Sequence, residues 1–257
     1  MLFAVDVGNT HMVIGVFDHA TLRCHWRVKT DKTSTSDELA AICHGLFAME
    51  GLQFFDITQV IIASVVPVMQ AAWATFSAKH LKTEPLVVGD NVQTGMPVLI
   101  DNPRELGADR IVNAVAAFEE YRAALIVVDF GTAITWDCVS VQGEYLGGAI
   151  APGLGISMEA LGSRTAKLPQ VDISTPPPSA IGTNTVTAIK AGILYGYGGM
   201  VDGLILRLRE QFAPAARPIT VATGGMATLI APYATTIDHV DSMLTLKGLR
   251  LLHAKNT

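Results

Sequence analysis

The sequence is poor in charged residues, and the charges that it has leave a small negative excess. Only 16% of its 257 residues are Asp, Glu, Lys or Arg, and the formal net charge at pH 7 is −5. No stretch gathers Lys and Arg into a basic stripe that could follow a phosphate backbone. Nucleic acid is therefore not an expected partner. A small anionic ligand still is, provided that a metal ion, backbone N–H groups or a few cations assist its binding.

Cysteine and long apolar runs are scarce as well. The three cysteines, Cys24, Cys43 and Cys138, are scattered without a CxxC pair, so we expect buried free thiols in a reducing, cytoplasmic environment. No apolar run reaches the roughly 18 residues of a membrane span, so no membrane association is expected. The seven histidines show no HExxH motif or paired spacing, which argues against a zinc site.

Apolar residues make up half of the chain, enough for a full core, and the length allows two domains of about 120 residues each. The patterns predict one order of elements twice: a β-hairpin, a third strand, a helix, a strand and a helix. In the first half, strands are predicted at 2–6, 12–18, 22–30, 59–66 and 85–89. Helices are predicted at 36–51, with Ser36 as the N-cap, at 67–81 and within 102–122. In the second half, strands are predicted at 125–129, 133–141, 144–150 and 219–225, helices within 151–168 and at 183–211 and 243–254, and a Pro-rich loop at 172–179. The repetition predicts duplicated α/β domains, 1–117 and 118–257, with a cleft between them.

Each half opens on a hairpin that carries an aspartate before its turn. Asp6 precedes Gly8 and Thr10 in the first hairpin, and Asp129 precedes Thr132 in the second. Glycine lets the backbone N–H groups of such a turn approach phosphate oxygens closely, and a neighbouring carboxylate suits this place if a cation lies between. Asp, Gly, Asn and Thr are also ordinary turn residues, which for one hairpin alone is the better reading. Two hairpins at matching positions favour phosphate binding.

The two motifs "DVGNT" and "DFGTA" resemble the phosphate motifs of the superfamily of acetate and sugar kinases, Hsp70 chaperones and actin, and "VATGG" resembles its adenosine motif. Within that superfamily, the combination with "NPRELGADRIVNA", "GGAIAPG" and "IGTNTVTAIKAGI" resembles type III pantothenate kinase over essentially the whole chain. The resemblance implies two ribonuclease H-like (actin-like ATPase) domains, each a mixed sheet flanked by helices. It further implies ATP-dependent phosphorylation of pantothenate to 4'-phosphopantothenate, the first step towards coenzyme A, with Mg²⁺, a monovalent cation (K⁺ or NH₄⁺) and a homodimer.

The resemblance also assigns site residues. It implies contacts to ATP and its phosphates from Asp6, Val7, Gly8, Asn9, Thr10, His11, Met12, Val13 and Thr132. It implies contacts to pantothenate from Ile100, Gly107, Ala108, Asp109, Arg110 and Thr185. Asp109 matches the catalytic base, Asp129 the monovalent-cation ligand, and Asp6 is expected to orient Mg²⁺ indirectly.

Asp109 lies in the first turn of a predicted helix whose buried stripe includes Ile111. A separation of two residues, about 200° around a helix, turns Asp109 away from that stripe. The helix dipole is expected to keep its carboxylate ionised and therefore weakly basic, which phosphoryl transfer tolerates because the hydroxyl mainly has to be oriented. Without the motif, an ordinary first-turn acid is the better reading.

Two further residues, Arg110 and Thr185, keep two readings each. Arg110 could hold the carboxylate of pantothenate through its planar fork, or pair on the surface with Glu105. Thr185 could contact the substrate or cap a helix. His11 is expected to be a turn residue near phosphate and not a base.

Ile100 is a departure from the family, which often has a tyrosine seven residues before the glycine of "GADR". An aliphatic side chain can line a pocket but cannot donate a phenolic hydrogen bond. The contact with the substrate at this position is therefore open, but the departure does not change the reaction that the resemblance implies.

The predicted helix at 183–211 is rich in glycine, which is unfavourable in a helix interior by up to about 1 kcal/mol per residue. This richness predicts close helix packing, within one chain or at a dimer interface. Two other functions stay open: another small-molecule kinase of the superfamily, and a non-catalytic nucleotide-binding regulatory protein. The Asp109–Arg110 pair argues against the second, because a nucleotide switch needs neither a base nor a carboxylate clamp.

Overall fold

A computed structural model describes residues 1–89 and 91–257, which divide into two compact units. Unit 1 consists of Met1–Met96, Asn102–Ala116 and Met243–Thr257, and unit 2 of Pro97–Asp101 and Ala117–Ser242. The domains expected from the sequence, 1–117 and 118–257, are continuous, whereas each unit of the structure consists of more than one segment. Residues 97–101 belong to unit 2, and the C-terminal segment 243–257 belongs to unit 1. The predicted cleft between the two halves stays a prediction.

Unit 1 is built on a five-stranded mixed sheet of order β3-β2-β1-β4-β5. Its strands are β1 (Leu2–Val7), β2 (His11–Asp18), β3 (Thr21–Lys29), β4 (Gln59–Ser64) and β5 (Leu86–Val87). The first three are antiparallel, and β4 and β5 run parallel to β1. The helices are α1 (Ser36–Met49), α2 (Pro67–Phe76) with a π-helical turn Ser77–Leu81, the first part of α3 (Ala108–Tyr121), and α7 (Leu244–Lys255).

The sheet of unit 1 is covered on both faces. One face packs with α1 and α2 in a core that includes Phe3, Phe47 and Trp73, all at most 1% exposed. On the other face lies α7, where a Cβ on Gly15 of β2 would come within 2.9 Å of Leu246. The central strands β1 and β4 therefore read as nearly continuous apolar runs, as expected of strands buried on both sides, whereas the edge strand β3 alternates.

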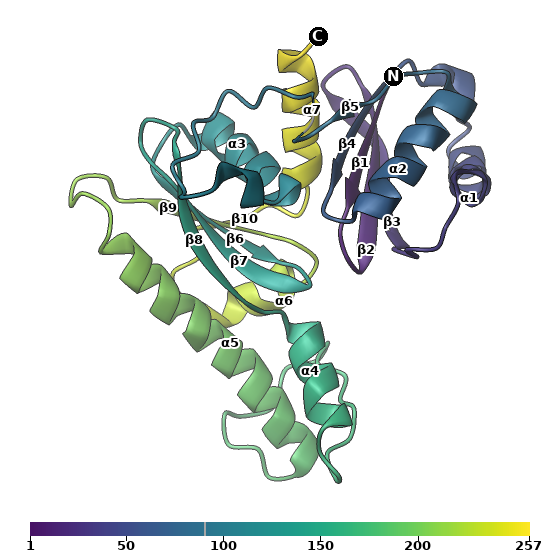
Figure 1. Ribbon diagram of the computed structural model, residues 1–257. Helices are drawn as coiled ribbons and strands as arrows, with labels where there is room; N and C mark the ends of the chain where they lie inside the picture. The colour runs from purple at the N-terminus through teal and green to yellow at the C-terminus, as the bar shows by residue number, and fades with distance from the viewer. Residues whose placement is uncertain (90) are drawn as a thin grey trace. The chain divides into compact units, whose positions relative to one another are not determined.

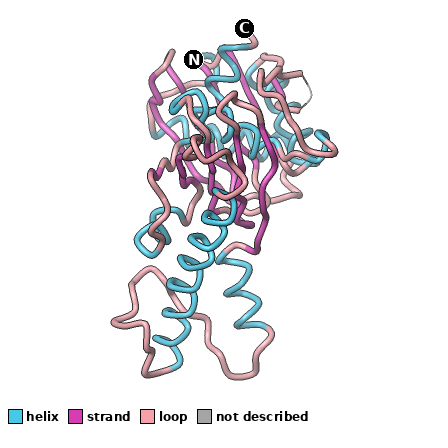
Figure 2. Tube along the Cα trace, turned by 90° about the vertical axis from the view of Figure 1, so that its left-hand side faces the viewer, coloured by secondary structure: helices cyan, strands magenta, loops and turns pink. Residues whose placement is uncertain are grey.

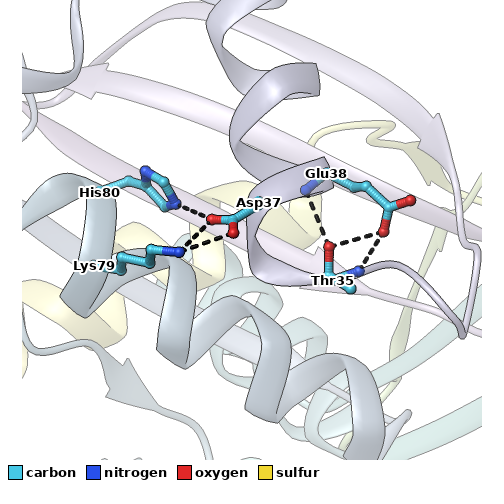
Figure 3. Close-up of polar contacts among 5 residues, drawn as sticks. All are labelled: Thr35, Asp37, Glu38, Lys79 and His80. Atoms are coloured by element: carbon cyan, nitrogen blue, oxygen red, sulfur yellow. Dashed lines mark hydrogen bonds and ion pairs between the residues drawn. The ribbon is translucent and has the colours of Figure 1, made fainter.

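Helix α1 is fixed at its start by two sets of side-chain contacts (Figure 3). Thr35, rather than Ser36 as the sequence suggested, is the N-cap, because Thr35 and Glu38 form a reciprocal capping box. Asp37 accepts from Lys79 at 2.7 Å and contacts His80 at 2.8 Å, which ties the first turn of α1 to the π-helical turn. These bonds lower the pKa of the Asp37 carboxyl, those from Lys79 most.

Unit 2 repeats the design with a sheet of order β10-β9-β6-β7-β8 (Figure 1). Its strands are β6 (Leu125–Phe130), β7 (Ala133–Val139), β8 (Tyr145–Pro152), β9 (Ile219–Thr223) and β10 (His239–Val240). The helices are α4 (Leu154–Ser163), α5 (Thr185–Arg209), the short α6 (Ala227–Ile230) and the end of α3. A core with Trp136 of β7, Leu194 and Val201 joins the sheet to α5. Both views show α4 and the first half of α5 running beside each other beyond the sheet (Figures 1 and 2).

The predicted architecture is confirmed: two mixed sheets with helices, each opened by an Asp-bearing hairpin, appear in the predicted order. The sequence patterns missed β10 and α6, which are only two and four residues long and too short to show a period. The three cysteines are free and buried, as expected. None of the described helices is both long enough and apolar enough to cross a membrane.

Candidate active site

The first Asp-bearing turn lies between β1 and β2 and is braced from the end of β3. The Gly8 N–H donates to the His11 carbonyl at 3.1 Å, which closes the turn. The Thr30 hydroxyl donates to the Gly8 carbonyl at 2.7 Å, and the Thr30 N–H donates to the Thr10 carbonyl at 2.9 Å. Lys32 reaches the Asn9 amide oxygen at 3.2 Å. The turn is thus held in one shape with a lysine beside it.

Only part of the predicted phosphate-binding run exposes its side chains. Asn9 and Thr10 are exposed, whereas Val7 and Met12 are at most 1% exposed and belong to the core. The Met12 sulfur accepts from the indole N–H of Trp73 at 3.2 Å. Val7 and Met12 can therefore serve a ligand only through their main chain.

His11 begins β2 and contacts Arg27 of β3, with 3.1 Å between Nη2 and Nδ1. Because a guanidinium can only donate, this bond requires a neutral imidazole whose Nδ1 accepts. Partial burial, followed by the positive charges of Arg27 and Lys29, lowers the pKa of His11. The expectation that His11 lies near phosphate and is not a base stays a prediction.

The second Asp-bearing turn lies between β6 and β7 and is held by close backbone packing. The Gly131 N–H donates to the Ala133 carbonyl at 3.1 Å, and the Gly153 N–H donates to the Thr132 carbonyl at 3.0 Å. A Cβ on Gly153 would lie 2.3 Å from the Thr132 oxygen. A Cβ on Gly224, whose φ is +90°, would lie 2.3 Å from Oδ1 of Asp129. Glycine is therefore required at both positions for the backbone to approach the Asp129 carboxylate and the main chain of Thr132 this closely.

The "GADR" segment starts helix α3. Gly107 precedes the helix, Ala108 is its first residue, and Asp109 lies in the first turn as predicted. The Arg110 N–H donates to Oδ1 of Asp109 at 2.8 Å. A Cβ on Gly107 would lie 2.5 Å from that same oxygen, so the glycine leaves room for the carboxylate. Glu105, the alternative partner of Arg110, accepts from Asn102 at 2.8 Å.

The pKa of Asp109 is shifted in the direction opposite to the one expected from the helix dipole. Burial raises the pKa of the Asp109 carboxyl, and the bond from the Arg110 N–H and the Arg110 charge only partly oppose this effect. The helix dipole alone had suggested a fully ionised, weakly basic group. Desolvation outweighs it, and a carboxylate with a raised pKa is a stronger base.

The remaining predicted contacts to pantothenate lie in unit 2. Ile100 belongs to a segment that bonds to the edge of the sheet, where the Leu99 N–H donates to the Tyr145 carbonyl at 2.8 Å. Thr185 is the first residue of α5, and Asn184 is its N-cap, so the capping role considered for Thr185 is wrong. Thr185 instead lines a cavity of about 600 Å³ together with Leu161, Leu168, Ile189 and Ile193.

The structure thus groups the predicted residues in two sets. Asp6 to Val13 and Gly107 to Arg110 belong to unit 1, and Ile100, Asp129, Thr132 and Thr185 belong to unit 2. Sequence reasoning missed the residues that hold the turns, namely Thr30, Lys32, Gly153 and Gly224. Gly153 and Gly224 lie in the motifs "GGAIAPG" and "VATGG", but neither motif showed that they contact the second turn, and no local pattern marks Thr30 or Lys32.

Comparison with known proteins identifies the family. A model of the type III pantothenate kinase family matches residues 2–207. A type III pantothenate kinase from Geobacter sp. (strain M21) is 51% identical over 256 residues, and one from Anaeromyxobacter sp. (strain K) is 52% identical over 256 residues, with 100% of each chain covered in both cases. Component A of (R)-2-hydroxyglutaryl-CoA dehydratase from Acidaminococcus fermentans, at 13% identity, shares the fold with a TM-score of 0.56 over 99% of this chain and 96% of its own.

These findings confirm the duplicated actin-like ATPase fold and identify the chain as a kinase. The family model covers most of the chain, and the full-length relatives are more than 50% identical to it. The other activities of the superfamily have no such support. The chain belongs to the type III pantothenate kinase family.

Proposed function

We propose that the chain transfers the terminal phosphoryl group of ATP to the hydroxyl of pantothenate, with Asp109 as the base, as the first step of coenzyme A synthesis. The environment of Asp109 carries this assignment. Its carboxylate is held by the Arg110 N–H at 2.8 Å, and burial raises its pKa towards the range of an effective base. The full-length match to type III pantothenate kinases supports the substrate.

Arg110 is the proposed partner of the pantothenate carboxylate. It follows the base directly, so binding of the carboxylate and orientation of the hydroxyl would be coupled through one helical turn. A planar guanidinium is suited to a bidentate bond with a carboxylate. Thr185 and the apolar side chains around its cavity are the proposed contacts for the rest of the substrate.

The first turn is the proposed phosphate cradle. Asn9 and Thr10 are exposed at its tip, and Lys32 contacts Asn9, so backbone N–H groups, a hydroxyl and a cation meet at one place. Asp6 precedes this cradle on β1, where its register partners are Val13 and Ala63. A single carboxylate fits a Mg²⁺ ion that keeps most of its water and binds mainly to substrate phosphates, and such an ion would offset phosphate charge.

Asp129 is the proposed ligand of a monovalent cation, K⁺ or NH₄⁺, with Thr132 touching ATP. The donor set fits such an ion, because a carboxylate at the end of β6 is enclosed by the backbone at Gly224. Neither Lys nor Arg occurs between Arg122 and Arg164, so this part of the chain offers phosphate no cationic side chain of its own. A bound cation would supply that charge.

A homodimer is the proposed assembly. Gly192, Gly196 and Gly199 of α5 have nothing within 4 Å of an added Cβ, so this face packs against no other described part of the chain. Ile181, Val186 and Tyr195 nearby are between 43% and 79% exposed. A second copy that covers this face would explain both features, and sedimentation of the chain as a monomer at micromolar concentration would contradict it.

The test is a kinase assay with a panel of acceptors. Purified chain with Mg²⁺, K⁺ and ATP should phosphorylate pantothenate and leave acetate and simple sugars unchanged, as read by mass spectrometry of the products. Phosphorylation of a sugar or acetate in place of pantothenate would overturn the proposed substrate. Binding of ATP without transfer to any acceptor would favour a regulatory nucleotide-binding protein.

A further inference from the structure

Asp129 lies in a row of oxygen-bearing side chains that crosses the sheet of unit 2. Its register partner on β7 is Thr135, and its partner on β9 is Thr223. Partners in register point to the same face of a sheet, with Cβ atoms about 4.5–5.5 Å apart in an antiparallel pair. Trp136, the next residue on β7, belongs to the core against α5, so Thr135 and Asp129 face the opposite side. A carboxylate is thus flanked by two hydroxyl-bearing residues.

The corresponding row in unit 1 has no such hydroxyls. Asp6 pairs with Val13 on β2 and with Ala63 on β4, and both of these side chains are apolar. The hydroxyls beside Asp129 are therefore not a general feature of the duplicated hairpin. They distinguish the second copy from the first.

A buried carboxylate sets the direction of the Thr135 hydroxyl. Thr135 Oγ1 donates to Oδ2 of Asp137 at 2.9 Å, and the Tyr145 hydroxyl donates to Oδ1 of Asp137 at 2.5 Å. Asp137 is 0% exposed and Tyr145 is 1% exposed. A hydroxyl has one proton and two lone pairs, so a proton committed to Asp137 leaves the Thr135 oxygen to accept or to ligate on its other side.

The first hairpin lacks this arrangement too. Gly15 stands two residues after Val13, where the second hairpin has Asp137 two residues after Thr135. A Cβ on Gly15 would press on Leu246 of α7, so apolar packing occupies this place in unit 1. The buried polar network, like the row of hydroxyls, belongs to the second copy alone.

We propose that Thr135 is a further ligand of the monovalent cation at Asp129, and that Asp137 and Tyr145 are positioning residues that point its oxygen towards that ion. This inference rests on the proposed cation site at Asp129. One negative carboxylate and a neutral hydroxyl oxygen suit an ion of single charge, because they balance it without an excess of negative charge. Each carboxylate oxygen of Asp137 accepts one of these hydrogen bonds, Oδ2 from Thr135 and Oδ1 from Tyr145.

The test compares Thr135→Val with Thr135→Ser. Valine has the same shape without the hydroxyl, and it should raise the K⁺ concentration for half-maximal activity by about tenfold, the effect expected for a lost supporting group at a metal site. Serine retains the hydroxyl and should keep the K⁺ dependence of the unmodified chain. Thermal melting gives a readout without turnover, because the Tm in KCl can be compared with the Tm in choline chloride at the same concentration. Thr135→Val should lose most of any rise in Tm caused by K⁺.

The positioning residues are tested with Tyr145→Phe and Asp137→Asn. Both should raise the K⁺ concentration for half-maximal activity, Asp137→Asn by more, because it also alters the acceptor of the Thr135 proton. A purely structural role would lower Tm equally in KCl and choline chloride and leave the K⁺ dependence unchanged, which would overturn this part of the proposal.

Failure of the Thr135 ligand can be told apart from failure of the cation site itself. If K⁺ changes neither the activity nor the Tm of the unmodified chain, the cation site at Asp129 is refuted, and the Thr135 ligand with it. If the unmodified chain responds to K⁺ and Thr135→Val responds identically, Thr135 is not a ligand while Asp129 can remain one. A Rb⁺ ion located crystallographically away from Thr135 would likewise refute Thr135 as a ligand.

Discussion

The two Asp-bearing turns share a sequence pattern, yet different parts of the chain hold them. Side chains brace the first: Thr30 bonds to both ends of the turn, and Lys32 reaches its tip. Main chain and glycine enclose the second, with Gly153 against the turn and Gly224 against the carboxylate of Asp129. The first turn has cationic side chains around it, and the stretch that carries the second has none.

This difference shows how duplication can lead to divided roles. A short turn motif supplies backbone N–H groups in both copies, but the groups around it decide which charge it attracts. Lysine and arginine beside the first turn favour phosphate. Hydroxyls in register with Asp129 favour a cation beside the second. Four experiments follow in order of decreasing expected effect: the first concerns the proposed base outside both turns, and the other three test this division.

The largest effect should come from Asp109, which belongs to neither turn. Asp109→Asn should lower kcat by about 10²- to 10⁴-fold, the usual contribution of a general base, while ATP binding by the two turns persists. Because burial raises the pKa of this carboxyl, the acid limb of kcat/KM should lie above the ordinary pKa of aspartate, about 3.9.

The same variant should also be more resistant to unfolding at neutral pH. A carboxyl whose pKa is raised on folding contributes stability below its unfolded pKa, and this contribution is lost as the pH rises through the folded value. Asparagine has no charge to desolvate. Urea unfolding at pH 7.5 measures the gain, with Asp18→Asn as an exposed control. Undiminished turnover of Asp109→Asn would remove Asp109 from its proposed role.

Replacing the carboxylate of one turn at a time should raise the requirement for a different ion in each variant. Asp6→Asn should raise the Mg²⁺ concentration for half-maximal activity, and Asp129→Asn the K⁺ concentration, each by about 10- to 100-fold. Each variant serves as the control of the other in titrations of both ions. Equal shifts for the same ion in both variants would show that the turns are equivalent.

Glycine substitutions should affect the second turn more than the first. Gly153→Ala brings a methyl group to 2.3 Å from the Thr132 oxygen and should destabilise the fold by about 1–3 kcal/mol, as overpacking does, with a raised KM for ATP. Gly8→Ala, at 3.0 Å from the His11 carbonyl, should have a smaller effect. Gly155→Ala in α4 has nothing within 4 Å and is the matched control, expected to gain about 0.5–1 kcal/mol. Equal losses in urea unfolding for Gly153→Ala and Gly155→Ala would contradict the close packing inferred at Gly153.

The smallest effect should be a pH dependence that belongs to the first turn alone. Because burial and Arg27 lower the pKa of His11, the unfolded chain takes up this proton more readily than the folded one. Stability should therefore fall as the pH drops through the ordinary histidine pKa, about 6.5, towards the lowered value. His11→Gln should reduce that loss between pH 7.5 and pH 5.5, whereas the exposed His25→Gln should not.

Much of the fold could be predicted because the elements have strong local signals. The strands of both hairpins, the long helix α5 and the start of α3 at Ala108 follow from apolar periods, glycine and capping residues. Local pattern did not reveal that α7 covers the sheet of the first unit, since an amphipathic helix does not specify which sheet it packs on. The N-caps at Thr35 and Asn184 were each misplaced by one residue for a similar reason, because neighbouring Ser, Thr and Asn are all good caps.

The sequence by itself determined the family, the duplicated α/β design and the set of candidate site residues, because these reside in motifs a few residues long. Tertiary structure decided what surrounds each motif. Burial raises the pKa of Asp109 against the expectation from its helix dipole, and strand register places Thr135 beside Asp129 but Val13 beside Asp6. Such differences depend on contacts between residues distant in the chain. The two turns can therefore look alike in sequence and still be surrounded by different chemical groups.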